Sequence, residues 1–145
     1  MKNIQIAIDG PSGAGKSTMA KLVSKELGIL YLDTGAMYRT VALKALKTGV
    51  DTKDSAALSE MVAEIVIDVI YHDEQQKVYL DGEDVTGEIR TPEVTVGSSD
   101  VAVVPEVRKK MVELQQEIAK AKSVVMDGRD IGTHVLPNAD VKIFL

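Results

Sequence analysis

The fold is decided by Gly10-Pro11-Ser12-Gly13-Ala14-Gly15-Lys16-Ser17, a stretch that fits the pattern G-x-x-x-x-G-K-[ST]. It follows a short apolar run, Ile4-Gln5-Ile6-Ala7-Ile8, that is suited to a buried strand, and it precedes a predicted helix. Between a strand and a helix this pattern forms a phosphate-binding loop, because the chain turns sharply and presents its backbone N–H groups to an anion. A glycine-rich turn without a ligand would not require a lysine followed by a hydroxyl residue.

Each part of the loop has a predicted role in binding a nucleotide. The small residues let the backbone wrap the phosphates, and the first amides of the helix add the positive end of its dipole. We expect Lys16 to lie between the β- and γ-phosphates and the Ser17 hydroxyl to contact Mg²⁺. The predicted nucleotide-binding residues are Gly10, Pro11, Ser12, Gly13, Ala14, Gly15, Lys16, Ser17 and Thr18.

The composition predicts one globular domain in a reducing compartment. The chain has 145 residues, of which 45% are hydrophobic, and no cysteine, so it has neither disulfides nor thiolate metal sites. No apolar run is long enough for a signal peptide or a membrane span, so we expect a cytoplasmic protein without a membrane partner. The formal net charge of −5 argues against a surface that coats nucleic acid.

Helical and extended patterns alternate along most of the chain. We expect strands at 4–8, 30–32, 123–126 and 141–145, and helices at 15–27, 35–46, 55–63, from 92 and at 105–122. This alternation is typical of an α/β fold whose parallel sheet is flanked by helices. The residues expected to face inward on the helices are Met19, Leu22, Val23 and Leu27; Met37, Val41, Ala42 and Ala45; and Val107, Met111, Leu114, Ile118 and Ala121.

Residues 65–80 have the pattern of a β-hairpin instead. Strands are expected at 65–71 and 77–80, with a polar turn at 72–76 and a third strand near Val85. An antiparallel unit interrupts the β-α alternation, so we interpret it as an insert. The sequence thus predicts a single domain, 1–145, with a core at 1–62 and 105–145 and an insert at 63–104.

Two further strand ends carry chemistry. Val124-Val125-Met126-Asp127 is an apolar run that ends in a carboxylate, and we expect Asp127 to stand near Mg²⁺ at the carboxyl edge of the sheet. An Asp in a polar turn is the simpler alternative. Thr34 and Arg39 follow the second strand and could face the same crevice, whereas a helix cap by Asp33 or Thr34 is the alternative there.

Arginine is rare in this chain and histidine rarer. Four Arg, at 39, 90, 108 and 129, accompany thirteen Lys. Guanidinium binds phosphates and base edges through a planar fork, so these arginines are ligand candidates, with a surface ion pair as the alternative for each. We expect His72 and His134 in surface or loop positions without a catalytic role, because neither has the spacing of a metal ligand.

Four motifs, in this order, resemble those of the bacterial cytidylate kinase family: Ile-Asp-Gly-Pro-Ser-Gly-Ala-Gly-Lys-Ser at 8–17, Leu-Asp-Thr-Gly-Ala-Met-Tyr-Arg at 32–39, Gly-Glu-Ile-Arg-Thr-Pro-Glu-Val at 87–94 and Asp-Gly-Arg-Asp-Ile-Gly-Thr at 127–133. The resemblance covers the whole chain, including the insert, which in this family enlarges the nucleoside-monophosphate-binding region. It implies a P-loop kinase that uses ATP and Mg²⁺ to phosphorylate CMP or dCMP in pyrimidine nucleotide metabolism. It further implies Lys16, Arg39 and Arg129 in catalysis, Thr34 at the ribose, Arg39 and Arg129 at the acceptor phosphate, and Ser99, Arg108 and Asp130 at the cytosine.

These base contacts agree with the chemistry of cytosine. Its N4 amino group donates beside two acceptors, so Asp130 can accept from the amino group while Arg108 donates to the ring. Uracil presents O4 instead of the amino group, and this oxygen would face a carboxylate acceptor.

In this family the chain continues past the fourth strand into an arginine-rich lid and a last core strand and helix. The resemblance therefore implies an incomplete domain that lacks the C-terminal part of the core, and we expect the full-length form to be monomeric. A switch GTPase would need an N-K-x-D segment, which this sequence lacks. A P-loop kinase of another small acceptor would have no reason for the hairpin or for Asp-Gly-Arg-Asp. A non-catalytic nucleotide-binding fragment is the remaining alternative.

Overall fold

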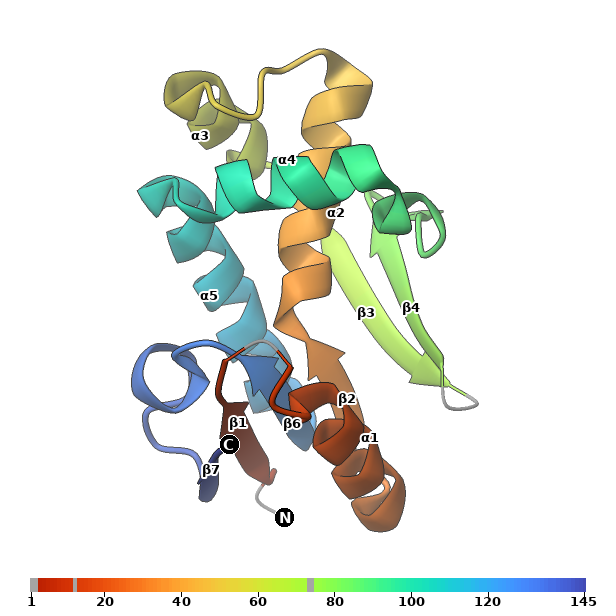
Figure 1. The fold of residues 1–145 in the computed structure, drawn as a ribbon, viewed down its shortest axis with the longest axis vertical. Coiled ribbons are helices and arrows are strands. Elements are labelled where there is room, and N and C mark those ends of the chain that lie inside the picture. Colours follow the sequence, from red (N-terminus) through yellow and green to blue (C-terminus); the bar gives the residue numbers. More distant parts are fainter. Residues whose placement is uncertain (1–2, 12, 73–74) are drawn as a thin grey trace. The chain divides into compact units, whose positions relative to one another are not determined.

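The computed structural model describes residues 3–11, 13–72 and 75–145, which form two compact units (Figure 1). The first unit comprises Met1–Thr34, Tyr71–Gln76 and Leu114–Leu145, and the second comprises Gly35–Ile70 and Lys77–Glu113. Ser12 and part of the expected turn at 72–76 lie outside the described residues.

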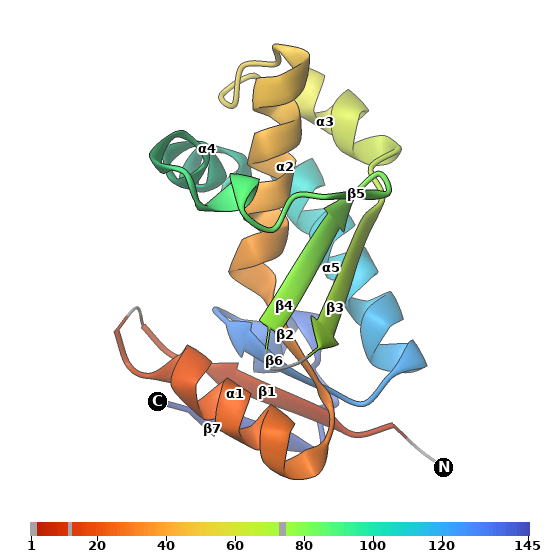
Figure 2. The ribbon, with the colours of Figure 1, turned by 90° about the vertical axis from the view of Figure 1, so that its right-hand side faces the viewer.

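The first unit contains a four-stranded parallel sheet in the order β2-β6-β1-β7 (Figures 1 and 2). The first four residues of β6 are buried, as expected for a strand that is covered on both faces. The sheet confirms the predicted α/β fold. Its strands are β1 (Gln5–Asp9), β2 (Leu30–Asp33), β6 (Val124–Gly128) and β7 (Val141–Phe144).

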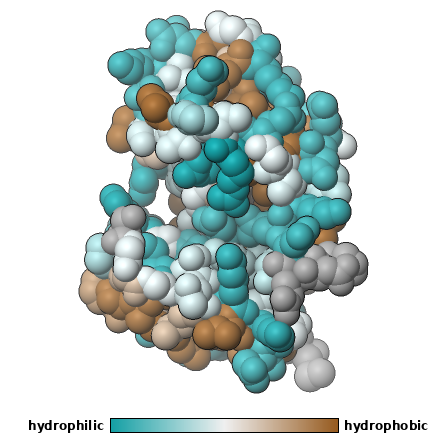
Figure 3. Space-filling view, turned by 45° about the vertical axis from the view of Figure 1, so that its right-hand side comes forward, coloured by the Kyte–Doolittle hydropathy of each residue, from teal (hydrophilic) through white to brown (hydrophobic). Residues whose placement is uncertain are grey.

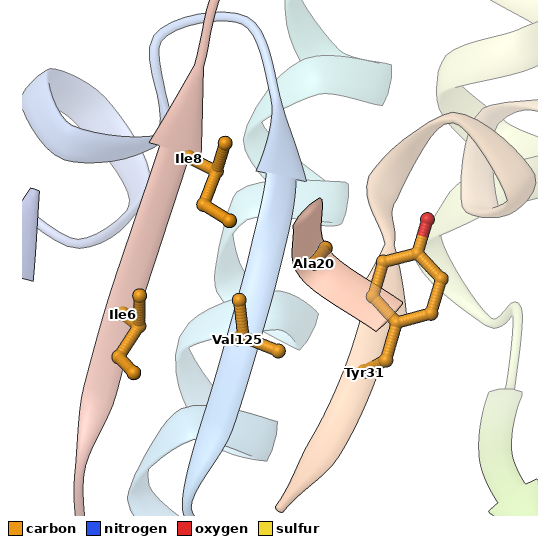
Figure 4. Close-up of a cluster of buried hydrophobic side chains, with 5 residues drawn as sticks. All are labelled: Ile6, Ile8, Ala20, Tyr31 and Val125. Carbon is orange, nitrogen blue, oxygen red and sulfur yellow. The ribbon is translucent and has the colours of Figure 1, made fainter. Parts of the chain in front are cut away.

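One face of this sheet packs against helix α1 (Lys16–Leu27). The strand register places side chains of β1, β6 and β2 side by side on that face, because register partners point the same way. Figure 4 shows the resulting core cluster, in which the aromatic ring comes from β2. Its buried members are Ile6, Ile8, Ala20, Tyr31 and Val125.

The predicted inner face of α1 is partly wrong. Leu22 and Leu27 are 59% and 54% exposed, whereas Ala20 and Ser24 are buried. Small side chains suit the side of a helix that lies close to a sheet. The buried Ser24 hydroxyl has a hydrogen-bond partner, because it donates to the Ile29 carbonyl at 2.6 Å. Hydrophobicity alone therefore selected the wrong positions.

The surface drawn in Figure 3 is mostly hydrophilic, with separate hydrophobic areas.

The second unit is built mainly from helices around α2 (Thr34–Thr48), whose predicted inner face is confirmed. Met37, Val41, Ala42 and Ala45 are fully buried. Helix α3 (Ser55–Ala63) is capped by Asp54, and α4 (Pro92–Ala102) is capped by Thr91. Helix α5 (Pro105–Ala121) begins in this unit and continues into residues of the first.

The insert forms a small sheet in the order β3-β4-β5, with strands Ile67–His72, Gln75–Leu80 and Glu83–Asp84. The expected turn at 72–76 is wrong in part, because His72 and Gln75–Gln76 belong to strands. The third strand ends just before Val85. Two short helical turns, η1 (Glu88–Arg90) and η2 (Ile131–Val135), complete the described elements.

The expected buried stripe of α5 is correct only at its start. Val107 and Met111 are buried, but Ala121 is exposed and Leu114 and Ile118 are half-buried. The buried face instead continues from Met111 through Gln115 and Ala119 in steps of four residues. Because Gln115 is polar, a search for apolar residues does not find this buried face.

Candidate active site

The phosphate-binding loop connects the end of β1 to the first residue of α1, as predicted. Gly13 and Gly15 have φ angles of 82° and 92°, in the left-handed region that favours glycine. Gly15 also occupies the N-cap of α1 and has no side chain that could satisfy the first amides of the helix. These N–H groups and the helix dipole make the loop suitable for binding an anion.

Lys16 is held against this loop by its own ammonium group. Its Nζ donates to the carbonyl oxygens of Gly10 at 2.7 Å and Pro11 at 3.1 Å. The charge also acts on Asp127 across the carboxyl edge of the sheet, where it lowers the pKa of that carboxyl. The loop and the strand end predicted to bind nucleotide and metal are thus close enough to interact electrostatically.

Asp127 ends the buried part of β6 and lies beside a second carboxylate. Asp33 is its register partner on β2, so both side chains point to the face of the sheet that α1 covers. Burial and the charge of Asp33 raise the pKa of Asp127 to about 6, although Tyr31 and Lys16 counteract the rise. The Tyr31 hydroxyl donates to Asp127 Oδ2 at 3.1 Å.

The segment after Asp127 is anchored from the opposite face of the sheet. Asp9, at the end of β1, accepts hydrogen bonds from the backbone N–H groups of Ile131 at 2.7 Å and Gly132 at 2.9 Å. Asp130 precedes them with a left-handed φ of 60° and an exposed side chain. The neighbouring Arg129 is also exposed. Arg129 and Asp130, both predicted to bind the acceptor CMP, thus lie directly before a backbone segment that Asp9 anchors.

Thr34 fastens the start of α2 to this turn. It is 6% exposed, and its hydroxyl donates to the backbone oxygen of Asp127 at 2.9 Å. A Cβ at Gly128 would come within 2.5 Å of Thr34 Oγ1 and 3.0 Å of Ile131 Cδ1. The close approach of these segments therefore requires glycine at position 128.

The second unit holds the other predicted substrate residues. Arg39 of α2 donates through Nη1 to Thr95 Oγ1 at 2.7 Å and more weakly to the Ile89 carbonyl at 3.4 Å. Ser99 is exposed on α4, and Arg108 is exposed on α5. Arg108 also acts on Tyr38: burial raises the pKa of that phenol, and the guanidinium moderates the rise.

The structure thus places the predicted residues in two groups. The first unit holds the loop, Thr34, Asp127, Arg129 and Asp130, and the second holds Arg39, Ser99 and Arg108. The sequence analysis missed four contributing residues of the first unit. Asp9 and Asp33 end strands as Asp127 does, so the same signal would have found them; Tyr31 and Gln76 had no sequence signal.

Metal ligands can be considered only among the described residues. No three His, Cys, Asp or Glu side chains gather there in a metal-binding arrangement. Two carboxylates and nearby hydroxyls at the sheet edge do provide the oxygen donors that Mg²⁺ accepts together with water.

His134 is exposed, as predicted. None of the helices in the described part of the chain is long and apolar enough to cross a membrane.

Comparison with known proteins gives one consistent result. The sequence profile of the family described as "Cytidylate kinase" matches residues 6–145. The chain is 56% identical over 145 residues to a cytidylate kinase of Caldicellulosiruptor bescii, covering all of this chain and 64% of that protein. It is 59% identical over 141 residues to the cytidylate kinase of Pelotomaculum thermopropionicum, covering 97% of this chain and 62% of that protein. The chain therefore spans less than two thirds of the length of these curated relatives.

Proposed function

Because the chain belongs to the cytidylate kinase family, we propose that it transfers the γ-phosphoryl group of ATP to CMP or dCMP, giving ADP and CDP or dCDP. The observation that carries this proposal is the family match over 6–145, which includes a phosphate-binding loop with its lysine folded against it. A phosphate oxygen of CMP attacks the γ-phosphorus and ADP leaves, so the protein needs no nucleophile of its own. Its part is to align the two nucleotides and to stabilise the charge.

The donor would bind in the first unit. We assign the β- and γ-phosphates of ATP to the loop from Gly10 to Thr18, where backbone amides and the helix dipole attract them. Lys16 would exchange its bonds to the loop carbonyls for bonds to phosphate oxygens, since an ammonium interacts more strongly with an anion than with a carbonyl.

Magnesium fits the acidic edge beside this loop. Asp127 is a buried carboxyl whose pKa is raised to about 6 by burial and by Asp33, so a cation would favour its ionised form. We propose that Asp127 and the Ser17 hydroxyl hold Mg²⁺, directly or through water. When bound, the ion neutralises charge on the transferred phosphoryl group.

The acceptor would use residues of both groups. We assign its phosphate to Arg39 and Arg129, and its ribose to Thr34. The Thr34 oxygen can accept a hydrogen bond from the ribose while its own O–H continues to donate to the Asp127 carbonyl. The bond from Arg39 Nη1 to Thr95 Oγ1 supports this role, because it fixes the guanidinium while other N–H groups of the fork can bind phosphate.

The base would be read by Ser99, Arg108 and Asp130. Asp130 accepts from the N4 amino group of cytosine, and Arg108 donates to its ring acceptors. The left-handed φ of Asp130 supports this assignment, since the anchored turn sets the direction of the carboxylate.

The proposal is tested by ADP release from the purified protein with ATP, Mg²⁺ and a panel of CMP, dCMP, UMP and AMP. We expect turnover with CMP and dCMP, and much less with UMP or AMP. ATP binding without turnover of any member would indicate a nucleotide-binding module, and a preference for another acceptor would indicate a different kinase. We also propose that the enzyme acts in the cytoplasm, where its nucleotides are, and as a monomer, which sedimentation velocity would test.

A further inference from the structure

Two residues of the insert hairpin, Tyr71 of β3 and Gln76 of β4, belong to the first unit and contact residues of the edge strand β2. Two contacts join them. The ring of Tyr71 meets the ring of Tyr31 edge to face, with centroids 5.8 Å apart and planes at 82°. Gln76 Oε1 accepts a hydrogen bond from the backbone N–H of Asp33 at 3.0 Å. Both contacts therefore fall on residues next to the candidate metal site.

The first contact leads directly to Asp127. Tyr31 is 2% exposed, and its ring lies among core side chains of β1, β6 and α1 (Figure 4). Tyr71 packs on this cluster from the hairpin. A ring that is enclosed in this way has little rotational freedom, so the position of its hydroxyl is fixed. That hydroxyl donates to Asp127 Oδ2.

The second contact is accompanied by a buried donor that lacks a hydrogen-bond partner among the described residues. β2 is an edge strand of the parallel sheet, and Gln76 covers the N–H of Asp33. The other end of the same amide, Nε2, is buried and finds no hydrogen-bond partner in the described part of the chain. A buried donor without a partner destabilises a protein. Such a side chain is typical of a position where function outweighs stability.

We propose that Tyr71 and Gln76 of the hairpin position the two carboxylates of the active site: Tyr71 acts on Asp127 through Tyr31, and Gln76 acts on Asp33 through its backbone N–H. This inference rests on the proposed function, because that function gives Asp127 a role in holding Mg²⁺. Tyr71, Tyr31 and Gln76 are positioning residues: they act through other residues and do not themselves touch the reacting atoms.

The first test separates positioning from substrate binding. Tyr71→Ala should lower kcat about tenfold and leave the KM for CMP within about twofold, because the residues assigned to the base lie elsewhere. Tyr71→Phe keeps the ring and should restore most of the lost kcat. Tyr79→Ala removes a half-buried tyrosine of the same hairpin and should match the wild type. Equal kcat for Tyr71→Ala and the wild type, or the same loss in Tyr79→Ala, would overturn the proposal.

A double-mutant cycle then tests the path through Tyr31. Tyr31→Phe removes the hydroxyl that binds Asp127 and should lower kcat to a similar degree. In that background Tyr71→Ala should cause less than half of its original loss in log kcat, because the contact it supports is already gone. Losses that multiply independently would show that Tyr71 acts only on general stability, and would refute the path.

Two measurements do not depend on activity. Tyr71→Ala should shift the side-chain carboxyl ¹³C resonance of Asp127, and Gln76→Met should accelerate hydrogen exchange of the Asp33 amide while leaving exchange in α2 unchanged. Unchanged values in both would refute the positioning role even in an active kinase. The proposed function would be refuted if the wild-type protein phosphorylated no CMP. A shifted Asp127 resonance in Tyr71→Ala would even then support the positioning of Asp127.

Discussion

Asp33, the last residue of β2, and Asp127, the penultimate residue of β6, are register partners on adjacent parallel strands, so two carboxylates share one face at the carboxyl edge of the sheet. The pKa of Asp127 rises from 3.8 to about 6, first because it is buried and second because Asp33 is negative. The charge of Asp33 disfavours the ionisation of Asp127, yet both carboxylates are retained at this edge. A bound cation is the ordinary way to relieve such a pair, which is why the arrangement supports a magnesium site.

Replacing Asp127 should make the protein more stable and less active. Its folded pKa exceeds the unfolded value, so its contribution to stability is fully present below about pH 4 and is lost as the pH rises through about 6. Asp127→Asn removes this penalty and should raise the free energy of unfolding at pH 7 by about 1–2 kcal/mol, less than the full shift implies, because water and Lys16 screen the charge.

Urea denaturation at pH 4 and pH 7 measures this effect. The gain should be present at pH 7 and absent at pH 4, and CMP-dependent ADP release should fall together with its dependence on Mg²⁺. Asp68→Asn, at an exposed position of β3, serves as the control. A gain of the same size at both pH values would mean that the charge of Asp127 is not its cause.

Lys16→Met should weaken ATP binding and abolish phosphoryl transfer without unfolding the protein. The ammonium group of Lys16 donates to carbonyl oxygens of its own loop, so the loss of these bonds leaves the sheet and α1 intact. We expect at least tenfold weaker ATP binding by titration calorimetry, because one charge-assisted contact to phosphate is lost. Lys21→Met removes an exposed lysine from the same helix and should bind like the wild type. Retained affinity in Lys16→Met contradicts the donor site described above.

Gly128→Ala should destabilise the first unit. The added Cβ would meet Thr34 Oγ1 at 2.5 Å and Ile131 Cδ1 at 3.0 Å, both on buried side chains that have little room to move. Forcing a methyl group into such a site costs about 1–3 kcal/mol, which thermal denaturation would detect. At Gly87 a Cβ meets nothing within 4 Å, so Gly87→Ala is the matched control and should change stability little. Equal stabilities of the two variants would be incompatible with the close packing of Thr34 on Gly128.

The fold was largely predictable because its signals are local. The phosphate loop, the apolar run before Asp127 and the capping threonine at 91 each specify structure within a few residues. The errors occur where packing between elements decides. Leu22 is exposed although it is apolar, and Gln115 is buried although it is polar, because the distance between a helix and its neighbour determines which side chains fit.

The site was predictable only at the level of its motifs. The strand-end rule identified Asp127 but also applies to Asp9 and Asp33, whose roles depend on which strands become neighbours. Tyr31 looks like an ordinary core residue in the sequence, and its hydrogen bond to Asp127 spans 96 positions. Sequence spacing contains no information on such a contact. All of the ligand assignments remain predictions, both those to ATP and Mg²⁺ and those to CMP.

Asp130→Asn should weaken the discrimination between CMP and UMP while the fold is retained. Asn tolerates the left-handed backbone at φ 60° about as well as Asp does, and the side chain at this position is exposed to solvent, so the free energy of unfolding should change little. An amide can donate to uracil O4 where a carboxylate cannot, and a paired base contact of this kind is worth about 1–3 kcal/mol of discrimination. The ratio of kcat/KM for CMP to that for UMP should therefore fall about tenfold or more. Asp140→Asn, which changes an exposed aspartate in another segment of the same unit, should keep the ratio. An unchanged ratio in Asp130→Asn, with both variants folded, would remove Asp130 from the base-binding site.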